Sequence, residues 1–201
     1  MVEIAVVDYG VGNLHSIRRG LELAGASVVV TGNAAEMEAA DAIVLPGVGA
    51  FGSAMQQLGD KLEVIRDAVD NKKPLLGVCL GMQLLLDSSE ESDIPGMGLI
   101  KGEVLRLPRG LKVPQMGWNS IELKREHPFV EGIASGSDLY FVHSYYTCPD
   151  DSKLIVASTD YGIDFPAIIA SDSMVGTQFH PEKSGDIGLK ILKNFVRTIK
   201  K

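Results

Sequence analysis

Apolar and polar residues follow two different periods along the first half of the chain. Short continuous apolar runs, typical of strands buried on both faces, are separated by segments in which apolar residues recur every three or four positions. The second kind of segment predicts amphipathic helices. The predicted strands are 2–7, 27–31, 41–45 and 74–78, and the predicted helices are 14–24 and 51–69. Strands that alternate with helices in this way predict a parallel sheet covered on both faces.

From Gly98 onward the pattern changes to short strand-like pieces separated by Gly, Pro and Asp. These predicted strands are 99–107, 120–124, 139–146, 154–158, 167–171 and 174–179. An amphipathic helix is predicted over 187–199, and the polar stretch 88–93 is predicted to be a loop. No linker or internal repeat divides the chain. We therefore expect one α/β domain, residues 1–201, with added antiparallel strands.

Composition narrows the function classes. The net charge of −7 argues against a nucleic-acid partner, which needs a positive surface. No apolar run approaches the ~18 residues that a membrane span needs, and the first residues lack the basic region of a signal peptide. We expect a cytoplasmic protein in which Cys79 and Cys148 do not form a disulfide. His15, His127 and His143 show no metal-ligand spacing, so neither metal nor cofactor is expected.

Cys79 is the most informative residue of the chain. It directly follows the predicted strand 74–78, and Gly77 and Gly81 lie two residues on either side. Small residues in these places let the backbone turn sharply and expose a nucleophile between a strand and a helix. The start of a helix also favours the thiolate, which is the reactive form of cysteine. The alternative is an ordinary core cysteine, and the pair of glycines favours the nucleophile.

His180 and Glu182 form the second informative pattern, in the sequence Gln-Phe-His-Pro-Glu. We expect an extended backbone here, in which side chains two residues apart face the same way. A carboxylate beside an imidazole fixes its tautomer and stabilises its protonated form. With Cys79 the two residues would complete a nucleophile, base and orienting group. The alternative is an exposed histidine near a surface glutamate.

Glycines at positions 47, 49 and 52 match G-x-G-x-x-G, the pattern of dinucleotide-binding loops. That pattern usually lies at the first strand–helix turn of its fold, whereas this one follows the third predicted strand. Backbone N–H groups that point at an oxyanion near Cys79 are the better interpretation, and a simple tight turn is the alternative.

Trp118 is predicted to lie either in the core or on a contact surface.

Three motifs in this order, Pro-Gly-x-Gly, Gly-x-Cys-x-Gly-x-Gln and His-Pro-Glu, resemble those of the class I (triad) glutamine amidotransferases over nearly the whole chain. Residues 7–14, 116–119 and 141–145 are similar to those of the glutaminase subunits of imidazole glycerol phosphate synthases. Gln115 and Gly185 depart from that pattern, where His and Ser are more usual. The resemblance implies a flavodoxin-like three-layer sandwich with a mostly parallel central sheet.

The resemblance also implies a role for each matching residue. Glutamine would be hydrolysed to glutamate and ammonia through a cysteinyl thioester. The implied catalytic residues are Cys79, His180 and Glu182, and the implied oxyanion donors are Val48, Gly49 and Leu80. The implied glutamine-binding residues are Gly47, Gln83, Glu91, Ser144 and Tyr145. The implied partner-facing residues are Asn13, Gln115, Met116, Trp118, Asn119 and Lys183.

The implied partner is a cyclase subunit with a (β/α)₈-barrel fold, which would form a heterodimer with this chain and receive the ammonia. Such a barrel needs about 250 residues, so the 201 residues here cannot contain it as well. We expect the glutaminase alone to be nearly inactive, with a peptide flip in Gly47–Gly49 as the switch. The alternatives are a glutaminase subunit for anthranilate, GMP or pyridoxal phosphate synthesis, a γ-glutamyl thiol hydrolase, and a non-enzymatic nucleotide-binding module.

Overall fold

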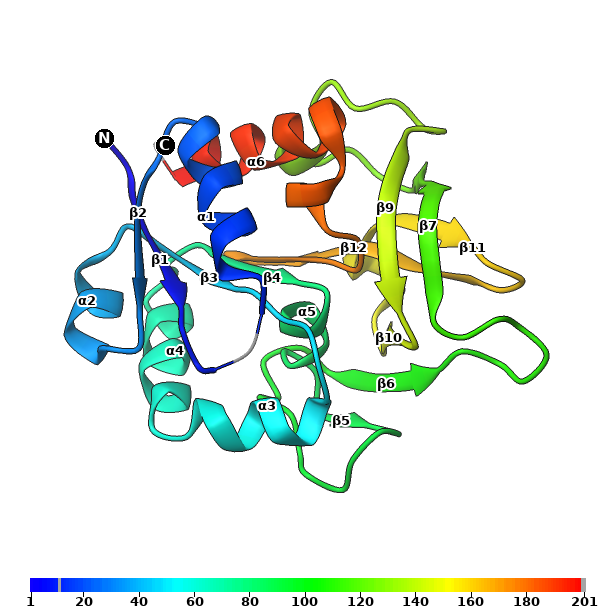
Figure 1. Cartoon of the computed structure of the whole chain (residues 1–201), viewed down its shortest axis with the longest axis horizontal. Coiled ribbons are helices and arrows are strands. Elements are labelled where there is room, and N and C mark those ends of the chain that lie inside the picture. Colours follow the sequence, from blue (N-terminus) through cyan, green and yellow to red (C-terminus); the bar gives the residue numbers. More distant parts are fainter. Residues whose placement is uncertain (11, 200–201) are drawn as a thin grey trace.

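The computed structural model describes residues 1–10 and 12–199. A central sheet of eight strands has the order β2-β1-β3-β4-β13-β12-β11-β8 (Figure 1). Its strands are β1 (Glu3–Val7), β2 (Ser27–Thr31), β3 (Ala42–Leu45), β4 (Leu75–Val78), β8 (Glu122–Leu123), β11 (Ile155–Asp160), β12 (Asp164–Ser171) and β13 (Met174–Thr177). The five strands from β2 to β13 are parallel, and the last three are antiparallel. The expected α/β class and mixed sheet are confirmed.

Two smaller sheets lie beside the antiparallel end of the central sheet (Figure 1). One contains β10 (Tyr145–Pro149), β6 (Gly102–Arg106) and the two-residue β5 (Ser88–Ser89). The other is a two-stranded pair of β7 (Gln115–Ser120) and β9 (Asp138–His143). Of these strands, β6, β9 from Leu139 onward and the start of β10 fall within predicted strands. The stretch 88–93, predicted to be a loop, contains β5, and β7 was not predicted apart from Ser120.

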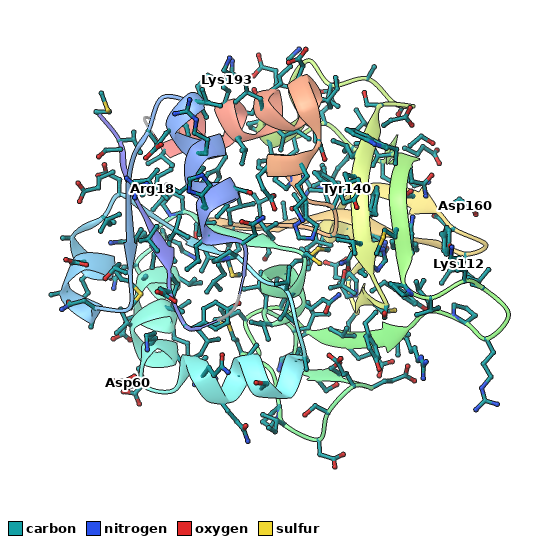
Figure 2. All side chains as sticks on the ribbon, viewed as in Figure 1. Arg18, Asp60, Lys112, Tyr140, Asp160 and Lys193 are labelled. Carbon is teal, nitrogen blue, oxygen red and sulfur yellow. The ribbon has the colours of Figure 1, made fainter. Side chains whose placement is uncertain are left out.

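Helices cover both faces of the central sheet, as Figure 1 shows. On one side lie α1 (Leu14–Leu23) and α6 (Gly185–Ile199), and on the other α2 (Ala34–Ala39), α3 (Phe51–Leu58), α4 (Lys61–Asp70) and α5 (Leu80–Gln83). The alternating side chains of β1 explain these layers: Ile4 and Val6 pack in the cluster that contains α1 and α6, whereas Ala5 and Val7 pack in the opposite cluster. Figure 2 shows Asp60 and Lys193 on the outside of these layers, where both are exposed.

Four details differ from the sequence predictions. The helix predicted over 51–69 is two helices, because Gly59 has φ +50 and ends α3. The strands predicted at 120–124 and 139–146 are each interrupted, at Ile121 and Ser144. Helix α2 was not predicted, and the helix after Cys79 is a single turn. Within the part of the chain that the structure describes, no helix is long and apolar enough to cross a membrane.

Candidate active site

Cys79 lies at the carboxyl end of the central strand β4, where ligands bind in open α/β sheets. Its N–H donates to the carbonyl of Thr177 at 2.7 Å, which joins the end of β4 to the end of β13. Cys79 has φ +53 and ψ −105, a backbone conformation that side-chain-bearing residues rarely adopt. The surrounding structure holds it there, at a cost of about 1–3 kcal/mol. This is the geometry expected of a nucleophile at a sharp strand–helix turn.

Gly77 and Gly81 are needed here for close packing rather than for unusual dihedral angles. Of these two glycines and Cys79, only Cys79 has a positive φ. A Cβ on Gly81 would lie 2.0 Å from the carbonyl oxygen of Leu45, and one on Gly77 would lie 2.7 Å from the carbonyl oxygen of Gly81. The turn is therefore packed against backbone on both sides. The prediction that small residues are needed at these two positions is confirmed, because neither position has space for a Cβ.

His180 and Glu182 face one another in a buried position. Nδ1 of His180 lies 2.8 Å from Oε1 of Glu182, and their side chains are 2% and 3% exposed. The extended backbone expected for this pair is wrong beyond His180, because β13 ends at Thr177 and Pro181–Lys183 is a 3₁₀ turn, η3. The turn brings the two side chains together. Because β13 pairs with β4, it also places His180 near Cys79.

The charge state of His180 follows from these neighbours. Burial is the largest influence and lowers the pKa, but Cys79 and Glu182 together outweigh it and raise the pKa of His180 to about 10. Nε2, the ring nitrogen remote from Glu182, meets hydrogen-bond geometry with no described residue. Cys79 therefore acts on it through proximity and charge. A protonated imidazole beside a cysteine sulfur is the arrangement of the reactive pair in thiol enzymes.

A cavity of about 240 Å³ opens above Cys79. It contains seven further residues that the sequence predicts for the site: Val48, Gly49, Leu80, Gln83, Glu91, Ser144 and Tyr145. Gly47 does not line the cavity, because it packs against the elbow: a Cβ there would lie 2.6 Å from Cβ of Leu80. The sequence interpretation missed three lining residues, Pro114, Val142 and His143, which lie on segments that carry no catalytic motif.

Backbone N–H groups are available on two sides of Cys79. Leu80 is the first residue of α5, and the N–H groups of Leu80, Val48 and Gly49 donate to no residue within 1–10 or 12–199. Gly49 has φ +113, and nothing lies within 4 Å of a Cβ built on it. These donors are suited to an oxyanion beside the sulfur. The structure thus gathers the three predicted oxyanion residues at the cavity.

Buried amides connect Cys79 to the rest of the cavity. Nε2 of Gln178 lies 3.6 Å from Sγ of Cys79, and Nε2 of Gln83 donates to Oε1 of Gln178 at 3.2 Å and to the carbonyl of Tyr145 at 2.8 Å. Sγ of Cys79 also lies 3.7 Å from the carbonyl oxygen of Val142. Gln178 was not predicted as a site residue, although it stands two positions before His180. Its complete burial beside Cys79 is a tertiary feature.

Glu91 reaches the cavity from the loop after β5. One of its oxygens accepts the N–H of Phe51 at 2.8 Å, so Glu91 caps helix α3, which has no cap from its own Ala50. The family resemblance implies that Glu91 helps to bind glutamine, and its second carboxylate oxygen is suited to an ammonium group. Glu91 therefore joins the cavity to the segment that follows Gly49.

Gln115 and His143 form a buried pair beside the cavity. Oε1 of Gln115 lies 2.9 Å from Nε2 of His143, and Nδ1 of His143 lies 2.8 Å from the carbonyl oxygen of Tyr145. Burial lowers the pKa of His143 to about 4, so it is neutral at ordinary pH. If the neutral ring donates from Nδ1 to the Tyr145 carbonyl, its Nε2 carries no hydrogen and can only accept. The Gln115 amide is then oriented with its nitrogen, rather than Oε1, toward Nε2. Gln115 is 3% exposed, so its side chain is internal rather than a surface contact.

Other predicted partner-facing residues do lie at the surface. Met116 and Trp118 on β7 are 65% and 59% exposed, which decides between the core and surface interpretations of Trp118. Trp118 packs edge to face on Tyr140, and Nζ of Lys183 lies 5.9 Å from the centre of the same ring. Asn119 is half-buried and bonds to the carbonyl of Asp160, and the exposed Asn13 caps α1. Gly185, the other departure from the family pattern, has φ +58, which favours glycine.

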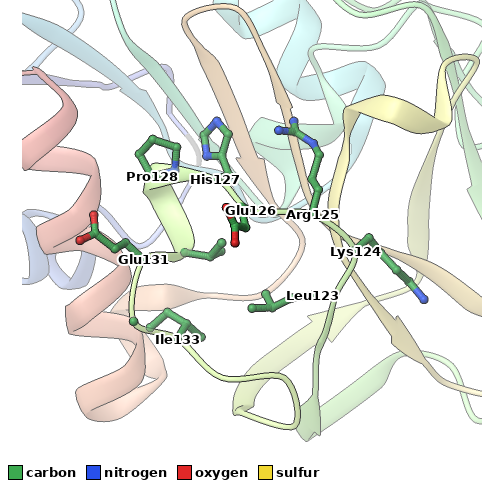
Figure 3. Close-up of a pocket in the computed structure, with 10 residues that line it drawn as sticks. Leu123, Lys124, Arg125, Glu126, His127, Pro128, Glu131 and Ile133 are labelled. Carbon is green, nitrogen blue, oxygen red and sulfur yellow. The ribbon is translucent and has the colours of Figure 1, made fainter.

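A larger cavity, about 690 Å³, lies elsewhere and is lined by residues of the single stretch Leu123–Ile133 (Figure 3). Its lining mixes the cations Lys124 and Arg125 with the anions Glu126 and Glu131. None of the predicted site residues lines it. Cys79 and the residues with free N–H groups line the smaller cavity, and His180 and Glu182 are buried near Cys79. We therefore take the smaller cavity as the candidate active site.

Comparison with known proteins agrees with this geometry. The family model described as glutamine amidotransferase class-I matches residues 5–199. The chain is 52% identical to "imidazole glycerol phosphate synthase subunit HisH" of Natronomonas pharaonis over 96% of this chain and 94% of that protein. It is 51% identical to the protein of the same name in Methanosarcina mazei over 98% of each chain. A structure of PurLQS from Thermotoga maritima shares the fold, with a TM-score of 0.79 at 20% identity over 98% of each chain.

Proposed function

Since the chain belongs to the class I glutamine amidotransferase family, we propose that it is the glutaminase subunit of an imidazole glycerol phosphate synthase. The observation that carries this proposal is the buried pair of His180 and Glu182 behind Cys79, at the base of a cavity with free backbone donors. The relatives named above, about half identical over nearly their whole length, support the choice of synthase.

In the proposed reaction the thiolate of Cys79 attacks the side-chain carbonyl carbon of glutamine. The negative charge passes to the carbonyl oxygen, which the N–H groups of Leu80 and of Val48 or Gly49 receive. The C–N bond then breaks as the imidazolium of His180 gives its proton to the departing ammonia. This leaves a γ-glutamyl thioester and a neutral imidazole, which takes a proton from water so that hydroxide releases glutamate. Glu182 holds the ring in position throughout.

The cavity supplies the contacts that a free amino acid needs. The second oxygen of Glu91 is suited to the α-ammonium group, and Gln83, Ser144 and Tyr145 line the same space. Gly47 contributes by letting the segment after β3 pack closely on the elbow. Gln83 is already bonded to Gln178 and Tyr145, so it is held in place before glutamine arrives.

The proposed partner is a cyclase subunit with a (β/α)₈-barrel fold. It would join the ammonia to a ribulosyl intermediate and yield imidazole glycerol phosphate and aminoimidazole carboxamide ribotide. The exposed Met116 and Trp118, with Lys183 beside them, form an apolar surface with a cation that suits a heterodimer interface. We place the pair in the cytoplasm. The unpaired Cys79 and Cys148 support a reducing compartment.

A reconstituted assay tests the proposal. The purified chain is mixed with glutamine, the ribulosyl intermediate and a cyclase subunit, and glutamate and imidazole product are measured together. We expect stoichiometric products with the cyclase, little glutamate without it, and a loss of roughly 10⁴-fold or more in Cys79→Ala. Equal glutamate formation with and without cyclase would contradict the proposed coupling. Activity only with an acceptor subunit for anthranilate, GMP or pyridoxal phosphate synthesis would assign the chain to that pathway instead.

A further inference from the structure

The segment from Pro46 to Phe51 carries two of the proposed oxyanion donors but is held mainly at its ends. In its middle, Val48 is 41% exposed and Gly49 has open space around it. At its C-terminal end, the N–H of Phe51 is bound by Glu91. At its N-terminal end, the carbonyl of Pro46 accepts a hydrogen bond from the hydroxyl of Tyr9. The direction of the Val48 and Gly49 N–H groups therefore depends on these two anchors and on the packing of Gly47 against Leu80.

Tyr9 is placed to act as a fixed anchor. Tyr9 is 4% exposed and packs in the apolar cluster on the α3 side of the sheet. Burial raises the pKa of Tyr9 well above its ordinary range, and Cys79 adds to the effect, so the hydroxyl stays protonated and remains a donor. The loop that carries Tyr9 also touches the segment directly: a Cβ on Gly12 would lie 3.3 Å from Cβ of Pro46.

We propose that Tyr9 is a positioning residue for glutamine hydrolysis, whose hydroxyl holds the Pro46 carbonyl and so sets the direction of the Val48 and Gly49 N–H groups. The inference rests on the proposed glutaminase function and adds a residue to it. An oxyanion donor acts mainly in the transition state, since the charge it receives is absent from the bound substrate. Loss of the Tyr9 hydroxyl should accordingly lower kcat and leave KM for glutamine nearly unchanged.

The test compares two tyrosines that make the same kind of bond. Tyr9→Phe removes only the hydroxyl that binds Pro46. The matched control is Tyr161→Phe, which removes a hydroxyl that donates to the carbonyl of Lys112 at 2.9 Å, away from the site. In the complex with the cyclase, we expect Tyr9→Phe to lower kcat roughly tenfold, with KM within about twofold, and Tyr161→Phe to match the wild type. An unchanged kcat, or a change in KM alone, would overturn the inference.

Two further measurements separate this role from a merely structural one. Iodoacetamide alkylates a thiolate by displacement of iodide at a methylene carbon, with no oxyanion at that carbon. The alkylation rate of Cys79, read by peptide mass so that the exposed Cys148 does not interfere, should be the same in Tyr9→Phe and wild type. A parallel loss of alkylation would show that Tyr9 acts on the thiolate or on the fold, and would overturn the proposal.

The second measurement is rescue by a donor of similar shape. Tyr9→p-aminophenylalanine restores an N–H donor to the Pro46 carbonyl and should recover kcat to within about threefold of wild type. Failure to recover would also count against the inference. The proposed function is tested separately, because it requires only that the wild-type chain hydrolyse glutamine when the cyclase is present.

Discussion

The two sides of the active site are built differently. The elbow side consists of residues 77–81 with His180 and Glu182, and it is buried and packed against backbone. The glycine side consists of residues 46–50. Gly47 packs against Leu80, but Val48 is 41% exposed and nothing lies within 4 Å of a Cβ built on Gly49. On the elbow side, by contrast, a Cβ at Gly81 would collide with the Leu45 carbonyl.

This difference separates two requirements of the proposed reaction. The nucleophile and base must hold one geometry, since a misplacement of about 1 Å can cost a hundredfold in rate. The oxyanion donors are required only once the tetrahedral intermediate forms, so they can be assembled later. An open glycine side held at its ends by Tyr9 and Glu91 is suited to control by a partner or by substrate.

The largest effect is expected on the elbow side, from Glu182→Gln. The amide no longer favours the imidazolium of His180, so we expect glutamine hydrolysis to fall by roughly 10³-fold. Steady-state rates with the cyclase measure this. The control is Glu122→Gln, which changes a glutamate 68% exposed at its side chain and should leave the rate unchanged. A loss below about tenfold in Glu182→Gln would show that the ring is held without the carboxylate.

The same variant changes the pH dependence of stability. The pKa of His180 is raised in the folded state to about 10, from 6.5. Its stabilising contribution is therefore complete below about pH 6.5 and is lost as pH rises toward 10. Urea unfolding across this range should show a smaller decline in the free energy of unfolding for Glu182→Gln than for wild type. Identical declines would contradict the pairing.

An intermediate effect is expected from alanine at the two contrasting glycines. Gly81→Ala places Cβ 2.0 Å from a backbone oxygen, so we expect a loss of about 4 kcal/mol or no folded protein. Gly49→Ala meets nothing within 4 Å, and only its φ of +113 opposes the change. There we expect a loss of roughly 1–2 kcal/mol. Denaturant unfolding compares the two, and similar losses would refute the distinction between the sides.

The smallest effect isolates the backbone strain at Cys79. Cys79→Gly and Cys79→Ala both remove the nucleophile, but only glycine adopts φ +53 without strain. The relief of about 1–3 kcal/mol is partly offset by the extra chain entropy of glycine. We therefore expect Cys79→Gly to be more stable than Cys79→Ala by about 1 kcal/mol in denaturant unfolding. An alanine variant of equal or greater stability would show that the turn is not strained.

Local patterns predicted the parallel half of the fold closely. The run at 27–31 is strand β2 without change, and the strands near Cys79 and before His180 differ from their predicted ends by one or two residues. Buried parallel strands are continuous apolar runs, so their signal is contained in a few residues. Helix α2 was not predicted because its six residues are too few to show a helical period. Asn33 and Glu36 at its start do resemble a capping pattern.

The parts that the sequence did not predict depend on contacts between distant segments. Strand β7 contains Gly117 and Asn119, which disfavour strands, and it forms because β9 pairs with it. Likewise, the pairing of Gln115 with His143 joins residues 28 positions apart. The candidate catalytic residues were identified because their motifs are local, and the buried amide of Gln178 was missed because its place beside Cys79 is set by the sheet.

The position of β13 in the sheet has a consequence for biosynthesis. This strand lies between β4 and β12 in the sheet, yet residues 174–177 are synthesised after both of these neighbours. Until then β4 has an unpaired edge, which is a site for mispairing with other chains. The nascent polypeptide also holds Cys79 without His180 until that strand inserts. If the proposed reaction is right, chains truncated before β13 should be unable to hydrolyse glutamine, because they lack His180 and Glu182.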